Sequence, residues 1–321
     1  MNTSRPFRFS VAGGPFLSSR EEVVELARRA EGQGVAGFSV ADHLSGPMSP
    51  LIVLAALAEE TTTLRLCTLV LSNDFRHPAV LAKEVATLDL LSGGRLELGM
   101  GSGWLKQDYD RAGIAFDDAS VRIGRLEESV QIIKGLLSSE PFSFEGLHYT
   151  IREMFGSPKP LQHPHPPILV GARTRQGLGV AGRHADAANL AVRTTQAGRI
   201  SVDDITAGAT NRKLHWLRTA AGDRFGMIEV GVTLVAISIT EQRSAAAREL
   251  LRCLADYTAG PLCEAVTEQD ILASPYVALG TVGEICEHLS ACREHFGISH
   301  FTISGAWLPE FAPVIGRLAG R

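Results

Sequence analysis

An acid and a histidine stand side by side where a predicted strand ends. Residues 37–41 form an apolar, β-like run, and Asp42 and His43 follow it directly. Histidine can transfer protons near neutral pH, so His43 is a candidate acid or base, unless it only caps a helix or bonds a loop carbonyl. Neighbouring strand residues point to opposite sides, so Asp42 is expected to hold the loop or position His43 through backbone N–H groups.

Two glycine-containing segments follow other predicted strands. Gly101-Ser102-Gly103-Trp104 comes after residues 96–100, and Gly171-Ala172-Arg173 comes after residues 168–170. Glycine lets a backbone approach a flat ligand closely, and backbone N–H groups beside a cation suit a phosphate. The alternatives are a tight turn for the first segment and a solvated arginine for the second. The pattern indicates an enzyme with an anionic, planar ligand.

Other arrangements of reactive residues are less informative. His163-Pro164-His165 lies in a proline-rich loop with no nearby cysteine or acid to complete a metal site, so no metal is expected. The chain contains no G-x-S-x-G, H-E-x-x-H or Walker motif. Five cysteines without a C-x-x-C pair indicate reduced thiols and a cytoplasmic location.

The composition excludes several classes of protein. The 321 residues are 45% hydrophobic and 21% charged, as in a globular protein, with a net charge of −4 that gives no basic field for nucleic acid. No apolar run approaches the roughly 20 residues of a membrane span. The first six residues lack the apolar core of a signal peptide.

Hydrophobic periodicity alternates between strands and helices along the whole chain. Capping boxes at Ser19–Glu22 and Thr281–Glu284 begin two of the helices. This alternation favours an α/β fold, a (β/α)8 TIM barrel formed as one domain by residues 1–321, with its site at the C-terminal strand ends. The eight predicted strands are residues 8–13, 37–41, 64–71, 96–100, 168–170, 187–192, 228–239 and 299–304.

Two intervals are too long for one helix each. Residues 104–167 contain a hairpin-like turn at 145–149 and a proline-rich run at 158–167, and the second interval spans residues 240–298. Both are expected to be insertions over the C-terminal mouth of the barrel rather than separate domains.

Residues 64–104 resemble the signature region of the bacterial luciferase-like superfamily. Three pieces carry the resemblance: Arg76-His77-Pro78, Leu88-Asp89-x-Leu91-Ser92-x-Gly94-Arg95 and Gly99-x-Gly101-x-Gly103. The chain is most similar to the oxidoreductase branch that uses the deazaflavin coenzyme F420. The resemblance implies a (β/α)8 barrel with a flavin or deazaflavin in its mouth, and a non-proline cis peptide at or next to Leu69-Val70.

The resemblance also assigns roles to residues. Asp42 and His43 would lie at the reactive face of the cofactor, and Arg173 would receive its phosphate. Arg175 follows this phosphate turn, and Arg76 and Lys159 are possible partners for the anionic tail of F420. The implied cofactor-binding residues are Leu69, Val70, Ser72, Asn73, Gly101, Ser102, Gly103, Trp104, Gly171, Ala172 and Arg173.

Two positions depart from the related dehydrogenases of sugar phosphates and secondary alcohols. Those enzymes carry a tryptophan and a glutamate where this chain has Pro47 and Trp104. The departure favours a reductase that transfers a hydride from reduced F420 to a small organic acceptor. We also expect the protein to be a homodimer. The alternative is an FMN-dependent monooxygenase that uses O₂. A non-catalytic flavin-binding relative and a barrel with a degenerate site are less favoured, because the strands, Asp42-His43 and the G-x-G turn are intact.

Overall fold

The computed structural model describes residues 5–14, 17–194, 199–255 and 266–321. Eight parallel strands among them form a closed barrel, because β3 pairs with β5 as well as β2, and β1 pairs with β13. The (β/α)8 fold predicted from the sequence is therefore confirmed. In pairing order the barrel strands are β1 (Arg8–Ala12), β2 (Gly37–Val40), β3 (Arg65–Thr68), β5 (Leu96–Gly101), β8 (Ile168–Ala172), β9 (Ala187–Leu190), β10 (Glu229–Thr233) and β13 (Ile298–Ser304).

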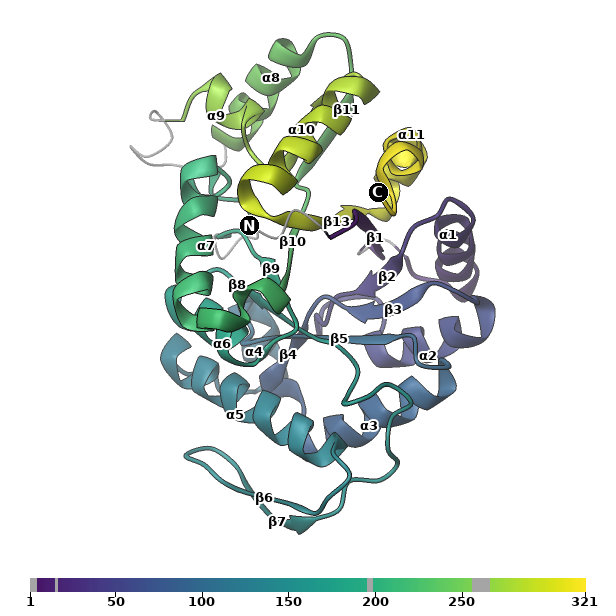
Figure 1. The fold of residues 1–321 in the computed structure, drawn as a ribbon, viewed down its shortest axis with the longest axis vertical. Coiled ribbons are helices and arrows are strands. Elements are labelled where there is room, and N and C mark those ends of the chain that lie inside the picture. The colour runs from purple at the N-terminus through teal and green to yellow at the C-terminus, as the bar shows by residue number, and fades with distance from the viewer. Residues whose placement is uncertain (1–4, 15–16, 195–198, 256–265) are drawn as a thin grey trace.

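Helices surround this barrel (Figure 1). They begin where the sequence offers caps: the Ser19–Glu22 and Thr281–Glu284 capping boxes both form. Gly297 ends α10 in the left-handed conformation, at φ 73°, which glycine adopts without a Cβ clash. The helices are α1 (Arg20–Gly32), α2 (Pro50–Glu60), α3 (Pro78–Leu91), α4 (Lys106–Ala112), α5 (Ala119–Leu137), α6 (Arg175–His184), α7 (Ala207–Ala221), α8 (Arg243–Ala255), α9 (Glu268–Leu272), α10 (Val282–Phe296) and α11 (Leu308–Leu318).

Charged side chains cross the barrel near the N-terminal ends of its strands. Arg8 of β1 donates to Glu97 of β5 at 2.8 Å and to Glu229 of β10 at 2.7 Å. Arg65 of β3 also binds Glu97, at 2.8 Å. Burial raises the pKa of Glu97, but these two arginines outweigh it and hold the pKa below its ordinary value. The network leaves the opposite, C-terminal end of the barrel to form the cavity.

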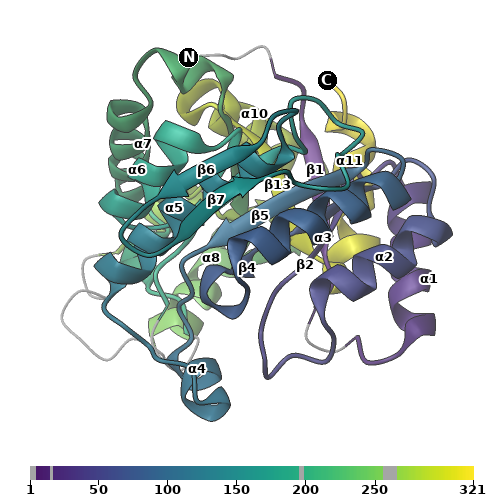
Figure 2. The same cartoon turned by 90° about the horizontal axis from the view of Figure 1, so that it is seen from below.

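The first long insertion takes two paths. Its beginning, α4, lies at the barrel mouth, as expected. The antiparallel hairpin β6 (Phe142–Glu145) and β7 (Thr150–Met154) instead packs along the outside of α5 (Figure 2), where Glu128 accepts the backbone N–H groups of residues 147–149. The expectation that the whole insertion covers the mouth is therefore wrong for the hairpin, because its turn is anchored to that helix.

The predicted strand over residues 228–239 is two strands. β10 ends at Thr233, and β11 (Ala236–Ile239) leaves the barrel to pair with β12 (Val277–Gly280), which precedes α10. Hydrophobic periodicity does not distinguish these strands, because the apolar run continues from β10 through residues 234–235 into β11. The final helix α11 was also absent from the predicted elements. Its end lies beside β1, where Phe7 donates its N–H to Arg321 O at 3.0 Å.

The described residues contain no helix that is both long and apolar enough to cross a membrane. Of the five cysteines, Cys263 lies outside the described residues, and Cys67, Cys286 and Cys292 are free thiols.

Candidate functional site

A cavity of about 520 Å³ opens at the C-terminal ends of the barrel strands. All the site residues predicted from the sequence line it, with one exception. Asn73 is buried outside the cavity, where its amide donates to the Tyr149 hydroxyl at 3.3 Å. The 3-10 turn after β4 (Leu71–Ser72) places Asn73 outside the cavity lining, so the cavity gives no support to its assignment to cofactor binding.

The partner of His43 comes from α4. His43 Nδ1 lies 2.9 Å from Asp108 Oδ2, and the other carboxylate oxygen accepts from the Ser45 hydroxyl at 2.8 Å and from its backbone N–H at 3.2 Å. Burial raises the pKa of Asp108, but the hydrogen bonds from His43 and Ser45 lower it below the ordinary value. A buried carboxylate of this kind fixes the His43 ring and leaves Nε2 free for chemistry.

Trp104 packs against the same histidine. Its ring lies edge-on to the imidazole, with the ring centroids 5.7 Å apart. Trp104 also lines the cavity. An indole contributes apolar surface and an N–H donor but no titratable acid, so the group beside His43 on this side cannot exchange protons.

Asp42 has a structural partner. Arg76 donates to its carboxylate at 2.6 Å and 3.3 Å, and the Ser72 backbone N–H donates at 3.1 Å. The pair ties the β2 exit to the segment after β4, which agrees with the expected loop-holding role of Asp42. Arg76 is engaged by Asp42 in this structure, so its expected role as a cation for the cofactor tail stays a prediction.

A bulge interrupts the third barrel strand at the floor of the cavity. The Leu69-Val70 peptide is cis, as predicted, and the strand resumes as β4 paired with β5. Val70 projects against two glycines of neighbouring strands: a Cβ on Gly101 would lie 2.7 Å from Val70 Cγ2, and one on Gly171 would lie 3.0 Å from Cγ1. The glycines of β5 and β8 therefore make the room that the bulge occupies.

The turn after β5 is held by an arginine that sequence reasoning missed. Arg122 of α5 is buried and donates to Ser102 O at 3.1 Å and Gly103 O at 3.4 Å. Gly103 has φ +74°, and a Cβ there would collide with the Tyr109 hydroxyl. No local pattern marks Arg122, because it reaches the turn only once α5 packs on the barrel.

A cation lies at the opposite side of the cavity. Arg173 follows β8 at the start of α6, where Thr174 caps the helix, and its guanidinium reaches Thr194 Oγ1 at 3.4 Å. Burial lowers the pKa of Arg173 below its ordinary value; Asp204 raises it, while Arg193 and Arg122 lower it further. Several cations beside a helix N-terminus make this end of the cavity suited to a phosphate.

Lys159 and Arg175 were the other two cations expected near the cofactor, and they lie in different places. Lys159 donates to Leu136 O at 3.1 Å, at the end of α5 away from the mouth, so its expected contact with a cofactor tail is wrong. Arg175 does not line the cavity but an adjacent groove. His163 and His165 are not part of any cluster of three metal-ligating side chains among the described residues.

The geometry fits a planar cofactor with a phosphate. The Val70 bulge offers an apolar floor, the Gly101–Gly103 turn offers exposed backbone, and Arg173 stands at the far end with the α6 N-terminus. Gly101 and Gly171 leave the room that the Val70 floor occupies, since side chains at these positions would meet Val70. The closed barrel and this cavity define the class of protein: a (β/α)8 enzyme with its ligand site at the strand ends.

Within that class, the chain belongs to the luciferase-like monooxygenase family, whose sequence profile matches residues 4–296. An FMNH2-dependent dimethylsulfone monooxygenase of Pseudomonas putida is 30% identical over 64% of this chain and 62% of its own length. An F420-dependent glucose-6-phosphate dehydrogenase of Amycolatopsis mediterranei is 34% identical over 51% of each chain. The matches thus span about half to three fifths of these relatives.

Solved structures share the fold over nearly the whole chain. A monooxygenase of Streptomyces bottropensis superposes with a TM-score of 0.71, 24% identity and 97% coverage of both chains. The F420-dependent tetrahydromethanopterin reductase of Methanopyrus kandleri gives a TM-score of 0.76, with 18% identity over 98% of this chain and 99% of its own. A monooxygenase and an F420-dependent reductase therefore share this fold.

Proposed function

We propose that this protein is an F420-dependent oxidoreductase that reduces a small organic substrate by hydride transfer. The observation that carries the proposal is the Asp108–His43 pair, which faces the same cavity as the Val70 bulge and Arg173. Among the described lining residues, Asp42 is paired with Arg76, and the Tyr276 hydroxyl donates to Leu190 O at 2.9 Å. His43 is thus the lining group with a nitrogen left to exchange a proton.

Each part of the cavity has a role in this proposal. Arg173 and the N-terminal turn of α6 would hold the phosphate, and the Val70 bulge would support the ring system. When bound, reduced F420 supplies a hydride to an electron-poor double bond. His43 Nε2 would donate the proton that balances this hydride, while Asp108 holds the ring and stabilises the histidine that carries the proton.

The side chain at position 104 favours reduction over alcohol oxidation. Oxidising an alcohol requires a base for the hydroxyl proton, and related dehydrogenases add a glutamate beside the histidine. Trp104 takes that place here and packs against His43 at a centroid separation of 5.7 Å. A single proton donor beside an apolar wall suits an acceptor that takes up one hydride and one proton.

An FMN-dependent monooxygenase is the second candidate. It is supported by the 30% identity to the FMNH2-dependent dimethylsulfone monooxygenase, which covers more of this chain than the F420-dependent relative does. In this case His43 would hold or protonate the oxygenated substrate, and Arg173 would hold the FMN phosphate.

Binding and turnover measurements separate the two candidates. We expect calorimetry to show F420 binding and weak or absent FMN binding, and we expect anaerobic oxidation of reduced F420 when an activated alkene is added. FMN binding without F420 binding, together with oxygen consumption driven by reduced FMN, would replace the proposal with the monooxygenase.

A further inference from the structure

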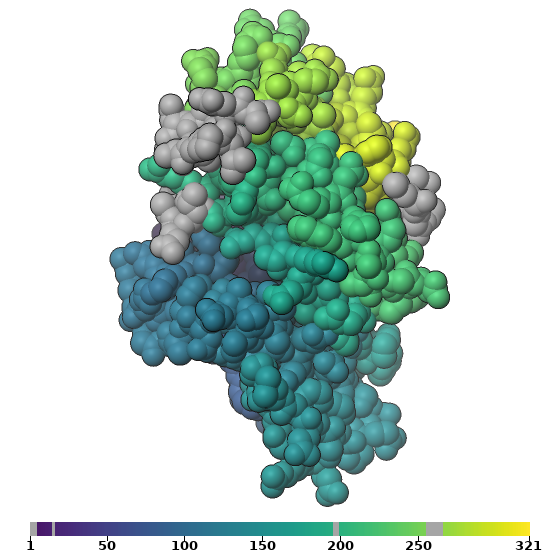
Figure 3. Space-filling model, turned by 90° about the vertical axis from the view of Figure 1, so that its left-hand side faces the viewer, coloured from purple at the N-terminus to yellow at the C-terminus, as the bar shows by residue number. Residues whose placement is uncertain are grey.

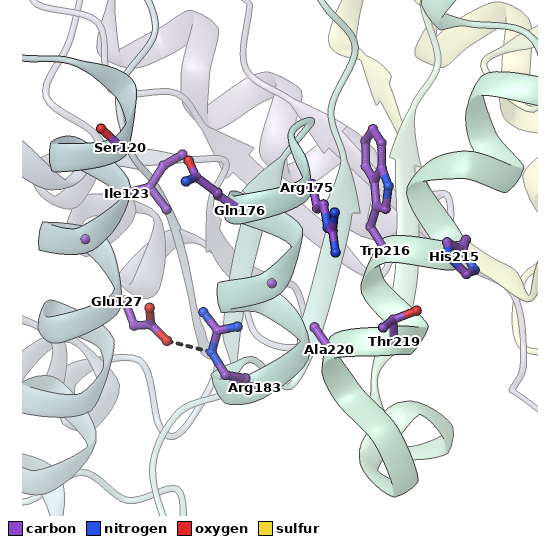
Figure 4. Close-up of a pocket in the computed structure, with 12 residues that line it drawn as sticks. Ser120, Ile123, Glu127, Arg175, Gln176, Arg183, His215, Trp216, Thr219 and Ala220 are labelled. Carbon is purple, nitrogen blue, oxygen red and sulfur yellow. Dashed lines mark hydrogen bonds and ion pairs between the residues drawn. The ribbon is translucent and has the colours of Figure 1, made fainter.

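A second hollow lies beside the mouth, on the outer surface of the barrel. It is a groove of about 770 Å³ over α6, walled by α5 and α7 (Figures 3 and 4). The groove adjoins the cavity: Ile123 lines both, and Thr174 of the cavity is followed by Arg175 of the groove. A ligand held at Arg173 could therefore continue outward along α6.

The floor of the groove is the outer surface of α6, which is recessed because this helix is rich in glycine. Gly177 and Gly182 are buried against the barrel and α7, and Gly179 lies in the groove itself. Small residues let the neighbouring helices approach α6 from the sides while leaving its outer surface recessed. The walls then rise on either side as Ile123 of α5 and Trp216 of α7 (Figure 4).

The groove carries excess positive charge in a chain whose net charge is −4. Its acid, Glu127, is already bound to Arg183 at 2.7 Å and to His184 at 3.0 Å. Arg175 is exposed, and its guanidinium makes no hydrogen bond or ion pair with another described residue and points toward Trp216 (Figure 4). An unpaired guanidinium next to the phosphate end of the cavity favours an anionic continuation of the ligand.

We infer that this groove binds the oligoglutamate tail of F420, with Arg175 as the first cation after the phosphate. The inference depends on the proposed function, because FMN ends at its phosphate and has no tail. Carboxylates of successive glutamates would meet Arg175 and then the Arg183 end of α6, while the chain lies over Gly179. The groove therefore distinguishes F420 species by the length of their tails.

The test compares F420 with an extended glutamate tail against its precursor that ends at the phospholactyl group. We expect the tailed form to bind more tightly, by about three- to tenfold at low ionic strength, and the difference to disappear in high salt. Arg175→Gln should weaken binding of the tailed form about three- to fivefold and leave binding of the precursor unchanged.

The matched control is Arg29→Gln, an exposed arginine of α1 on the other side of the barrel (Figure 1), which should change neither affinity. Equal affinities for the two F420 forms, or an Arg175→Gln variant that weakens both equally, would overturn the groove assignment while leaving F420 as the cofactor. Failure of both forms to bind, with FMN binding instead, would overturn the proposed function itself.

Discussion

Nδ1 of His43 lies 2.9 Å from a carboxylate oxygen of Asp108, although 65 residues separate them in the sequence. The two come from different layers: His43 follows β2, and Asp108 belongs to α4 in the insertion after β5. Asp108 is 2% exposed and is also bound by Ser45, so its position is fixed from two sides. The His43 ring is thus oriented by Asp108 of α4, whereas the neighbouring Asp42 is paired with Arg76.

This relationship predicts that Asp108 acts through His43. Asp108→Asn should lower turnover about 10- to 100-fold and change cofactor affinity less than about threefold, because the carboxylate does not reach the cofactor end of the cavity. The control is Asp110→Asn on the same helix, whose carboxylate pairs with Lys106 and with no other described residue. If the double variant with His43→Ala is much slower than His43→Ala alone, the two residues act independently and the prediction is wrong.

His43 itself should be needed for turnover and dispensable for cofactor binding. His43→Ala is expected to reduce turnover about 10²- to 10⁴-fold, with cofactor affinity within a few-fold, because Arg173 and the Val70 bulge lie apart from it. His43→Asn, which can hydrogen-bond but not titrate near neutral pH, separates proton transfer from substrate anchoring. Near-normal turnover of this variant across neutral pH would show that His43 is only an anchor.

Arg173 should contribute mainly to binding of the phosphate. Arg173→Ala is expected to weaken binding of F420 about 10- to 100-fold, since charge-assisted hydrogen bonds of partly buried groups are worth about 1.5–3 kcal/mol. Added salt should weaken the wild-type protein further. The deazaflavin without phosphate or tail serves as the internal control, because its affinity should not change. An equal loss for that molecule would place Arg173 in ring binding instead.

The glycines facing Val70 predict a compensating pair of substitutions. Gly101→Ala would bring a methyl group to 2.7 Å from Val70 Cγ2, so the bulge must shift. We expect a loss of about 1–3 kcal/mol in the free energy of unfolding and weaker cofactor binding. Adding Val70→Ala should restore part of both. Gly32→Ala, which has open space, should be neutral or stabilising in denaturant titrations.

The interior of the barrel predicts how stability depends on pH. Burial lowers the pKa of His300 below its ordinary value; Glu229 and Glu97 raise it, and Arg8 lowers it further. Below its ordinary pKa of about 6.5, the unfolded histidine takes up a proton that the folded one resists, so stability present above pH 6.5 is lost as the pH falls. One such histidine changes the free energy of unfolding by at most about 1.4 kcal/mol per pH unit.

His300→Gln should therefore flatten the acid decline in the free energy of unfolding, as measured by urea denaturation between pH 7.5 and pH 5. The decline should not vanish, because burial also lowers the pKa of His184 and His288. His295→Gln, an exposed change on α10, is the control and should keep the full slope. An unchanged slope in His300→Gln would show that His300 does not contribute to it.

The sequence by itself determined most of the helices and strands and the part of the cavity lining that lies at the exits of four strands. The βα alternation, the capping boxes and the residues at the strand exits are all local features of the sequence. Hydrophobic periodicity indicates which side of a helix or strand is buried, and a capping box marks where a helix begins. In a closed parallel barrel all strand ends meet at one mouth, so residues from Asp42 to Arg173 could be assigned to one site without knowing a single contact. The resemblance added the cis peptide at Leu69-Val70, which periodicity does not indicate.

The tertiary structure alone decided which of these residues act together. The pairing of His43 with Asp108, of Asp42 with Arg76, and the position of Asn73 outside the cavity depend on how an insertion of irregular path folds back over the barrel. Hydrophobic periodicity records burial along one element but says nothing about the direction in which a polar side chain reaches across to another. Such contacts between distant segments exist only after the barrel has closed, because closure is what brings those segments within hydrogen-bond distance.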